Sequence, residues 1–131
     1  MQPKINGVHH IALKAKGLDQ YQKLIAFYHG LLGMPVVRTW GSATAPACML
    51  STGDAMLELF SDAPDCLGMG ALRHLALATN DVDGCIEIVR NAGYQITMEP
   101  KDIVIPSDPP YPARIAFCIG PVGEEVEFFS E

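Results

Sequence analysis

Residues 8–15 read VHHIALKA and residues 72–78 read LRHLALA, so one motif, a histidine followed by a short apolar run, occurs twice in the chain. Both segments have the length and composition of a buried strand. A helical pattern follows each, with apolar residues at i, i+3, i+4 and i+7 over residues 24–31 and again over residues 82–89. The sequence therefore predicts an internal repeat.

Both halves continue in the same way after their helix. The first helix is expected to end at Gly33, and the second is expected to begin at Asn80 or Asp81 and to end near Gly93. Three strand-like runs then follow in each half, over residues 36–40, 47–51, 55–60, 95–98, 114–119 and 125–129. Residues 103–114 contain four prolines, which predicts a loop.

This order of elements predicts an α+β fold. We expect two tandem βαβββ modules, at about residues 6–62 and 70–131, that form a curved mixed sheet with a cleft inside a single domain. A chain of 131 residues with 49% hydrophobic and 18% charged residues is long enough to bury its own core.

Composition also argues against several classes of function. The chain has no apolar run long enough to cross a membrane and no evident signal peptide, so we expect a cytoplasmic protein without a membrane partner. The formal net charge of −6, with scattered basic residues, argues against nucleic acid binding. The four cysteines form no CxxC pair and are expected to be reduced thiols.

Two histidines and two glutamates occupy matching positions in the repeat. His10 and His74 lie in the first strands of the modules, and Glu58 and Glu127 lie in the last strands. A buried carboxylate is costly unless it is paired, hydrogen-bonded or bound to a metal. If the first and last strands share a sheet, His10 faces Glu58 and His74 faces Glu127. We therefore predict a site for one divalent metal ion, Ni²⁺ or Zn²⁺. His9 is expected to face the other way and to be structural.

At these positions the chain resembles a known family over nearly its whole length. The segments VHHIALKA, AFYHGLLGMPVV, AMLELF, LRHLALATNDVD and GPVGEEVEFFSE are similar to landmarks of the vicinal oxygen chelate superfamily (glyoxalase/bleomycin resistance/dioxygenase). The order His, Glu, His, Glu resembles glyoxalase I (lactoylglutathione lyase). Extradiol dioxygenases of the superfamily use two histidines and one glutamate around Fe(II) instead.

The resemblance implies an enzyme with a small-molecule substrate. Glyoxalase I converts the hemithioacetal of a 2-oxoaldehyde, methylglyoxal, and a thiol, glutathione, into a 2-hydroxyacyl thioester through an enediolate, which serves methylglyoxal detoxification. By match to the family, Glu127 is the expected general base and Glu58 acts on the opposite face of the substrate. Relatives of this length also imply a homodimer, with the metal site either within one chain or shared between two.

Four further residues are candidates for substrate binding. In the glutathione-using enzymes an Arg lies four residues after the first ligand and an Asn four residues after the second, whereas this chain has Lys14 and Asp62 there. Lys14 can act as a point charge, and Asp62 would repel a glutathione carboxylate. Tyr111 and Arg114 of the proline-rich segment are the other two candidates, with a solvated connector as the alternative.

Two other readings remain open at this point. The chain can be another metal-dependent enzyme of the superfamily, such as an epimerase or a thiol transferase. It can also be a resistance module that binds a ligand without chemistry, although such modules often lack the metal ligands that this chain retains.

Overall fold

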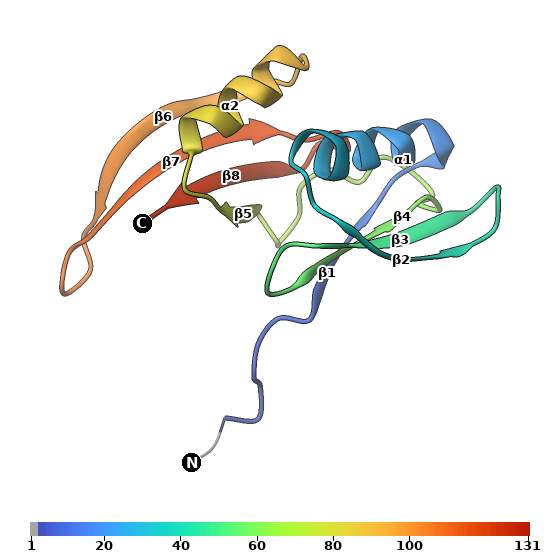
Figure 1. Ribbon diagram of the computed structural model, residues 1–131, viewed down its shortest axis with the longest axis horizontal. Coiled ribbons are helices and arrows are strands. Elements are labelled where there is room, and N and C mark those ends of the chain that lie inside the picture. The colour runs from blue at the N-terminus through green and yellow to red at the C-terminus, as the bar shows by residue number, and fades with distance from the viewer. Residues whose placement is uncertain (1–2) are drawn as a thin grey trace. The chain divides into compact units, whose positions relative to one another are not determined.

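The computed structural model describes residues 3–131, which fall into two compact units. Unit 1 ends at Asp65 and unit 2 begins at Cys66. Figure 1 shows that each unit consists of one sheet with helical turns along one side.

Unit 1 contains four strands and a continuous helical segment. Its elements are β1 (His10–Lys14), α1 (Gly17–Ile25), the π-helical η1 (Ala26–Leu31), β2 (Val36–Gly41), β3 (Pro46–Ser51) and β4 (Met56–Phe60). The strands lie in the order β1-β4-β3-β2, with β1 parallel to β4 and the other neighbours antiparallel. The first and last strands of the module are therefore paired, as the sequence predicts.

Unit 2 repeats this plan. Its elements are β5 (His74–Ala78), α2 (Val82–Asn91), β6 (Ile96–Ile105), β7 (Tyr111–Ile119) and β8 (Glu125–Ser130). The strands lie in the order β5-β8-β7-β6, and β5 is parallel to β8. Two four-stranded mixed sheets with the same βαβββ order confirm the predicted α+β fold and its repeat.

The core of each unit lies between the sheet and the helix. In unit 1, Leu57 and Leu59 of β4 and Leu24 of α1 are fully buried. In unit 2, Val126 of β8 and Ile86 of α2 are also fully buried. Because side chains alternate along a strand, the residues between these core positions lie on the opposite side of the sheet. We call this side the helix-free face.

Glycine and aspartate fix the helix ends as the sequence predicts. Gly33 and Gly93 have positive φ angles of 77° and 93°, which suit glycine after a helix because it lacks a Cβ atom. Asp81 caps α2, and its carboxylate accepts a hydrogen bond of 2.9 Å from the backbone N–H of Gly84.

The prediction of a loop over residues 103–114 is wrong. Strand β6 continues to Ile105 and β7 begins at Tyr111, so only residues 106–110 connect them. The last residue pair between β7 and β8 is Arg114 with Ser130, so Pro112 lies beyond the end of β8 and has only β6 beside it. A proline is tolerated there because no second neighbouring strand requires its missing N–H.

Replacing Asp81 tests how much its helix cap contributes to the stability of the protein. We expect Asp81→Ala to lower the free energy of unfolding by about 1 kcal/mol, because the Gly84 N–H loses its acceptor. Urea denaturation followed by circular dichroism measures the change. Asp81→Asn is the matched control, since its side-chain oxygen can still cap the helix. Equal losses in the two variants would contradict this role.

Candidate functional site

His10 and Glu58 lie side by side on the helix-free face of unit 1. His10 begins β1, and Glu58 is the central residue of β4, where it is paired with Ala12. The Nε2 atom of His10 is 3.4 Å from Oε1 of Glu58. The side chains are 38% and 15% exposed, respectively, so a ligand can reach the pair from solvent.

His74 and Glu127 form the equivalent pair in unit 2. His74 begins β5, and Glu127 in β8 is paired with Ala76. The Nε2 atom of His74 is 3.2 Å from Oε1 of Glu127. The rings of His74 and Phe117 meet edge to face, with their centroids 5.5 Å apart. The imidazole therefore has an aromatic neighbour as well as the carboxylate.

Glu127 is the more buried of the two acids. It is 7% exposed, and burial raises the pKa of its carboxyl group above the ordinary value because desolvation disfavours the charged form. To smaller extents, His74 lowers this pKa and Glu125 raises it. A raised pKa makes this carboxylate a stronger base than a solvated glutamate.

The spacing within each pair fits a shared metal ion. Two ligand atoms bound at about 2.1 Å to one ion are about 3.0 Å apart at a right angle and about 3.4 Å apart at the tetrahedral angle. The observed separations are 3.4 Å for His10 with Glu58 and 3.2 Å for His74 with Glu127. Imidazole and carboxylate are both ligands for borderline divalent ions.

Each unit by itself supplies two donors of this kind. Within residues 3–131 no group of three or more His, Cys, Asp or Glu side chains has an arrangement suited to a metal ion. The structure thus brings the predicted ligands together as two pairs, each within one module.

His9, which the sequence predicts to face the other way and to be structural, is a neighbour of this site. Its Nδ1 atom lies 2.8 Å from Nδ1 of His10, and the two rings meet edge to face. Strand β1 begins only at His10, so the alternation of faces does not extend to His9. If Nδ1 of His10 donates this hydrogen bond, its Nε2 atom keeps a free lone pair toward Glu58. The one sequence feature that could have predicted this contact is that the two histidines are adjacent in the chain.

Lys14 and Asp62, two candidate substrate residues, form an ion pair with each other. The Nζ atom of Lys14 is 3.5 Å from Oδ1 of Asp62 and 5.3 Å from the centroid of the Phe60 ring. The side chains of the pair are 45% and 58% exposed. Each charge already has a partner, so neither side chain offers an unpaired charge to a ligand.

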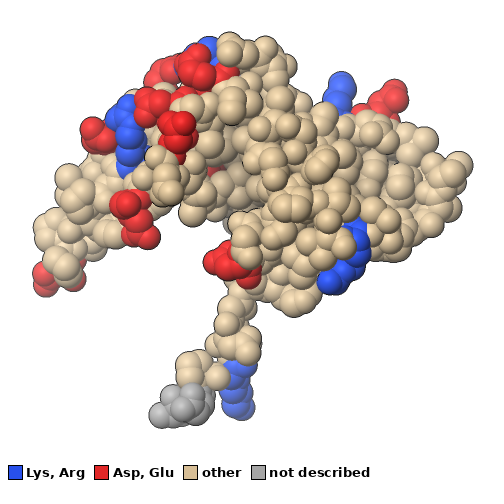
Figure 2. Space-filling view, in the orientation of Figure 1, with Lys and Arg blue, Asp and Glu red and all other residues tan. Residues whose placement is uncertain are grey.

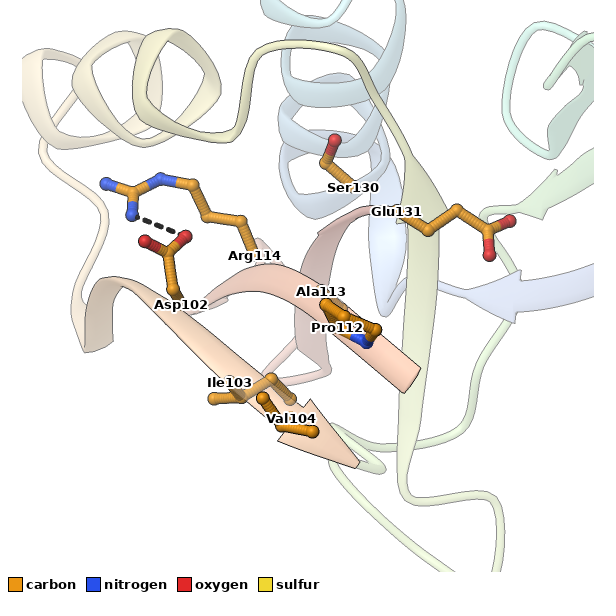
Figure 3. A pocket seen from close by; sticks show the side chains of 8 residues that line it. All are labelled: Asp102, Ile103, Val104, Pro112, Ala113, Arg114, Ser130 and Glu131. Carbon is orange, nitrogen blue, oxygen red and sulfur yellow. Dashed lines mark hydrogen bonds and ion pairs between the residues drawn. The ribbon is translucent and has the colours of Figure 1, made fainter. Parts of the chain in front are cut away.

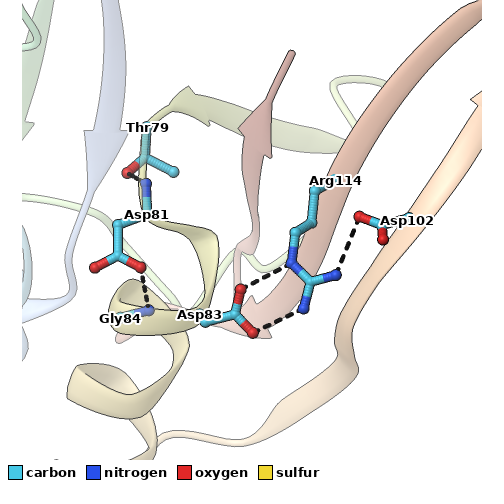
Figure 4. A network of polar contacts seen from close by, with 6 residues as sticks. All are labelled: Thr79, Asp81, Asp83, Gly84, Asp102 and Arg114. Carbon is cyan, nitrogen blue, oxygen red and sulfur yellow. Dashed lines mark hydrogen bonds and ion pairs between the residues drawn. The ribbon is translucent and has the colours of Figure 1, made fainter.

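Tyr111 and Arg114 lie on opposite faces of the second sheet. Tyr111 stacks on Phe129 at 6.3 Å between ring centroids, on the face that carries Glu127. Arg114 lies on the helix-covered face, where Nε and Nη2 donate hydrogen bonds of 2.8 Å to Asp83 in α2 (Figure 4). Its Nη1 atom donates a third, of 3.1 Å, to Asp102 in β6.

This network accounts for Arg114 without a ligand. The hydrogen bonds from Arg114 hold the pKa of the Asp83 carboxyl group below its ordinary value, and the two carboxylates raise the pKa of the guanidinium. The pairing ties the β6–β7 hairpin to the first turn of α2.

A groove runs along this hairpin near the end of β8 (Figure 3). Its volume is about 370 Å³, and it is lined by Asp102, Ile103, Val104, Pro112, Ala113, Arg114, Ser130 and Glu131. The Arg114 guanidinium beside it is already bound by carboxylates, as Figure 3 shows for Asp102. The groove therefore lacks a free positive charge, and none of the paired His and Glu side chains line it.

Comparison with known proteins assigns the family. A family model of the Glyoxalase/Bleomycin resistance protein/Dioxygenase superfamily matches residues 7–128. The chain belongs to this superfamily. A search of the curated proteins found no significant match.

Several solved structures of this fold are similar to the chain. SMU.1112c is 26% identical over 96% of this chain and 99% of that chain, with a TM-score of 0.70. The fosfomycin resistance protein FosX from Listeria monocytogenes, in complex with Mn(II) and sulfate, is 17% identical over 97% and 93%, with a TM-score of 0.71. The antibiotic binding protein TnmS3 from Streptomyces sp. CB03234 is 22% identical over 98% of each chain, with a TM-score of 0.68.

These relatives span more than one role. FosX was solved with a divalent metal, and TnmS3 is described as an antibiotic binding protein. Proteins of this fold thus include a resistance protein solved with a metal and an antibiotic binding protein, and the fold alone does not select a reaction. Among the described residues, no helix is long and apolar enough to cross a membrane.

The role of Arg114 is tested by removing its charge. We expect Arg114→Gln to raise the pKa of Asp83 toward that of an ordinary aspartate, about 3.9, because the bidentate donor is lost. NMR titration of side-chain carboxyl carbons measures it. Since the native pKa of Asp83 is lowered, its stabilising contribution is present above about pH 4 and disappears as pH falls through the native value.

The stability difference between the parent and Arg114→Gln should therefore be largest above about pH 4 and shrink in acid. Arg114→Lys is the control that keeps the charge without the bidentate geometry, and it should give an intermediate pKa for Asp83. An unchanged Asp83 pKa in Arg114→Gln would contradict this assignment.

Proposed function

We propose that His10, Glu58, His74 and Glu127 are the ligands of one divalent metal ion, Ni²⁺ or Zn²⁺, with the two pairs supplied either by one chain or by two chains of a dimer. The observation that carries the proposal is the duplication: the same imidazole and carboxylate pair occurs on the helix-free face of both units, at 3.4 Å and 3.2 Å. One such pair is an ordinary contact. Two at equivalent positions are what a four-ligand site built from a repeat requires.

The reaction proposed is that of a glyoxalase I type lyase. It converts the hemithioacetal of a 2-oxoaldehyde and a thiol into a 2-hydroxyacyl thioester by moving a proton between two neighbouring carbon atoms. A bound divalent ion supplies Lewis acidity toward the two neighbouring substrate oxygens, on which negative charge develops.

Glu127 is the proposed general base. Burial raises its pKa, so the protonated carboxyl group formed by proton abstraction is less unfavourable than at a solvated position. Glu58 is less buried, and its proposed role is on the opposite face of the substrate. His10 and His74 act only as ligands and hold their carboxylate partners in place.

One contact favours a substrate other than a glutathione adduct. Lys14 and Asp62 neutralise each other, so these two positions offer no net charge to the carboxylates of the tripeptide. The second candidate is therefore another metal-dependent reaction of the superfamily, proton transfer by an epimerase or addition by a thiol transferase. A binding module without chemistry is the third, and the duplicated pairs argue against it.

A homodimer and a cytoplasmic location are also proposed. Val8, Leu67 and Leu72 are exposed apolar residues outside the sheets. They support a dimer interface, since large apolar side chains at a surface often mark sites of protein–protein contact. Sedimentation velocity at several protein concentrations tests the dimer, and cell fractionation tests the location. Sedimentation as a monomer at every concentration would rule the dimer out.

Metal binding provides the first test of the site. Protein purified without added metal should contain Ni²⁺ or Zn²⁺ in elemental analysis, near one ion per chain. His10→Ala and His74→Ala should each weaken binding by at least about 100-fold in competition with a chromogenic chelator, because each removes a ligand. His29→Gln is the control, since His29 contacts the carbonyl of Met34 elsewhere. Parent-like affinity in both alanine variants would exclude the site.

Activity tests the assignment of the base. With metal in saturating excess and methylglyoxal plus either glutathione or a small thiol as substrate, Glu127→Gln should lower kcat by about 10²-fold to 10⁴-fold, because the amide cannot accept the proton. Glu125→Gln, a change at a neighbouring acid in the same strand, is the matched control and should keep most of the activity. A fully active Glu127→Gln variant would show that another group moves the proton.

The thiol series in the same assay separates the first two candidates. A rate that depends on thiol identity supports the lyase. Metal binding without turnover of any hemithioacetal would leave the epimerase and transferase reactions, which are tested with substrates that carry an acidic proton beside a carbonyl group or an electrophilic carbon.

A further inference from the structure

The helix-free face of unit 1 carries a second group of side chains beside the pair of His10 and Glu58. Trp40 in β2 and Phe60 in β4 meet edge to face at 6.1 Å between ring centroids. Ala47 in β3 is paired with both of them. Because this intervening side chain is small, the two rings can approach each other across the strand between them.

Trp40 is one of the exposed large apolar residues of unit 1. It is 41% exposed, although a tryptophan usually buries most of its large apolar surface. The flat face of an indole ring is a good partner for planar or cationic groups. An aromatic pair that leaves this surface exposed is thus suited to stack with a flat ligand.

Arg38 adds a positive charge on the same face. It lies two residues before Trp40 in β2, and its Nη1 atom contacts the Sδ atom of Met49 at 3.5 Å. A thioether is a weak acceptor, so the other donors of the guanidinium remain for a ligand. Within residues 3–131, no ion pair involves Arg38.

Other arginines of the chain are used differently. Arg90 pairs with Glu87 and Glu99, and Arg114 pairs with Asp83 and Asp102. Figure 2 shows basic side chains next to acidic ones on the part of unit 2 that α2 and β6 form. Unlike these two arginines, Arg38 has no acidic partner among the described residues, and it lies two residues from the exposed Trp40 on the same face.

The register places this group within reach of the proposed metal ligands. Arg38, Met49 and Glu58 follow one another across β2, β3 and β4. With neighbouring strands about 4.8 Å apart, Arg38 and Glu58 are separated by about 10 Å at the backbone. Phe60 is two residues from Glu58, or about 7 Å along the strand. One substituted aromatic ring fits in the space between Arg38 and Glu58 at these distances.

We infer that Trp40, Phe60 and Arg38 form a subsite for an aromatic carboxylate, with the ring stacked on the indole and the carboxylate bound by the guanidinium. The inference rests on the proposed function for its reactive end at His10 and Glu58 and names the class of substrate: an aryl compound with an anionic group away from its reacting carbon. Lys14 does not supply this charge, because Asp62 already neutralises it.

The single tryptophan of the chain gives a direct readout of this subsite. In ¹⁵N-labelled full-length protein freed of metal with chelator, the one indole N–H signal belongs to Trp40. Benzoate should shift this signal saturably. Cyclohexanecarboxylate, which keeps the charge but has a saturated ring, and benzamide, which keeps the aromatic ring but lacks the charge, should bind at least several-fold more weakly.

Arg38→Gln should reduce benzoate affinity by about tenfold, the loss expected for one charge-assisted contact, and leave benzamide affinity unchanged. Phe60→Leu should weaken both aromatic ligands. Arg73→Gln is the control, since Arg73 contacts a backbone carbonyl in unit 2. Circular dichroism of each variant establishes that it is folded.

An indole signal that ignores benzoate, or a benzoate affinity that Arg38→Gln does not change, would overturn the inference. So would a signal that shifts with protein concentration and not with benzoate, which would mean that a second copy of the chain covers this face. Because the titration uses metal-free protein, its failure is distinct from a failure of the metal site, which chelator competition reports separately.

Discussion

The site depends on the parallel pairing of the first and last strands in each module. This pairing joins residues that are far apart in the sequence, since β1 and β4 are the first and last strands of unit 1 and β5 and β8 are those of unit 2. It puts the histidine of one strand and the glutamate of the other on the same face. The helix between the first two strands of each module covers the opposite face, so no described helix of the same unit lies over the pair.

The two faces of each sheet therefore have different roles, one in stability and the other in carrying the candidate site. The helix-covered face holds the fully buried residues, such as Leu57, Leu59 and Val126, and its apolar burial stabilises the unit. The helix-free face holds side chains that would be costly in a core. Glu127 illustrates the cost, because its burial raises its pKa and only His74 offsets that shift. A perturbed carboxylate of this kind is what supports the proposal of Glu127 as general base.

The repeat also shows how the two modules diverge around a common pair. In unit 1 the aromatic neighbours are Trp40 and Phe60, with a guanidinium nearby that has no carboxylate partner. In unit 2, Phe129 has the position of Phe60 but stacks on Tyr111 of β7, and Arg114 is on the other face with two carboxylates. The ligand pair is duplicated, whereas the surroundings that select a substrate are not.

The sequence by itself determined the α+β class, the repeat and the helix ends, because periodicity, glycine positions and strand alternation are local properties. It predicted that each histidine faces its glutamate only if the first and last strands of a module share a sheet, and the tertiary structure meets that condition. The loop predicted from the prolines of residues 103–114 is wrong, because whether Pro112 is tolerated in a strand depends on where β8 ends. Only the tertiary structure decided that Arg114 serves Asp83, that Lys14 serves Asp62 and that His9 contacts His10. The orientation and partners of such side chains follow from strand register and packing, which residue spacing alone does not specify.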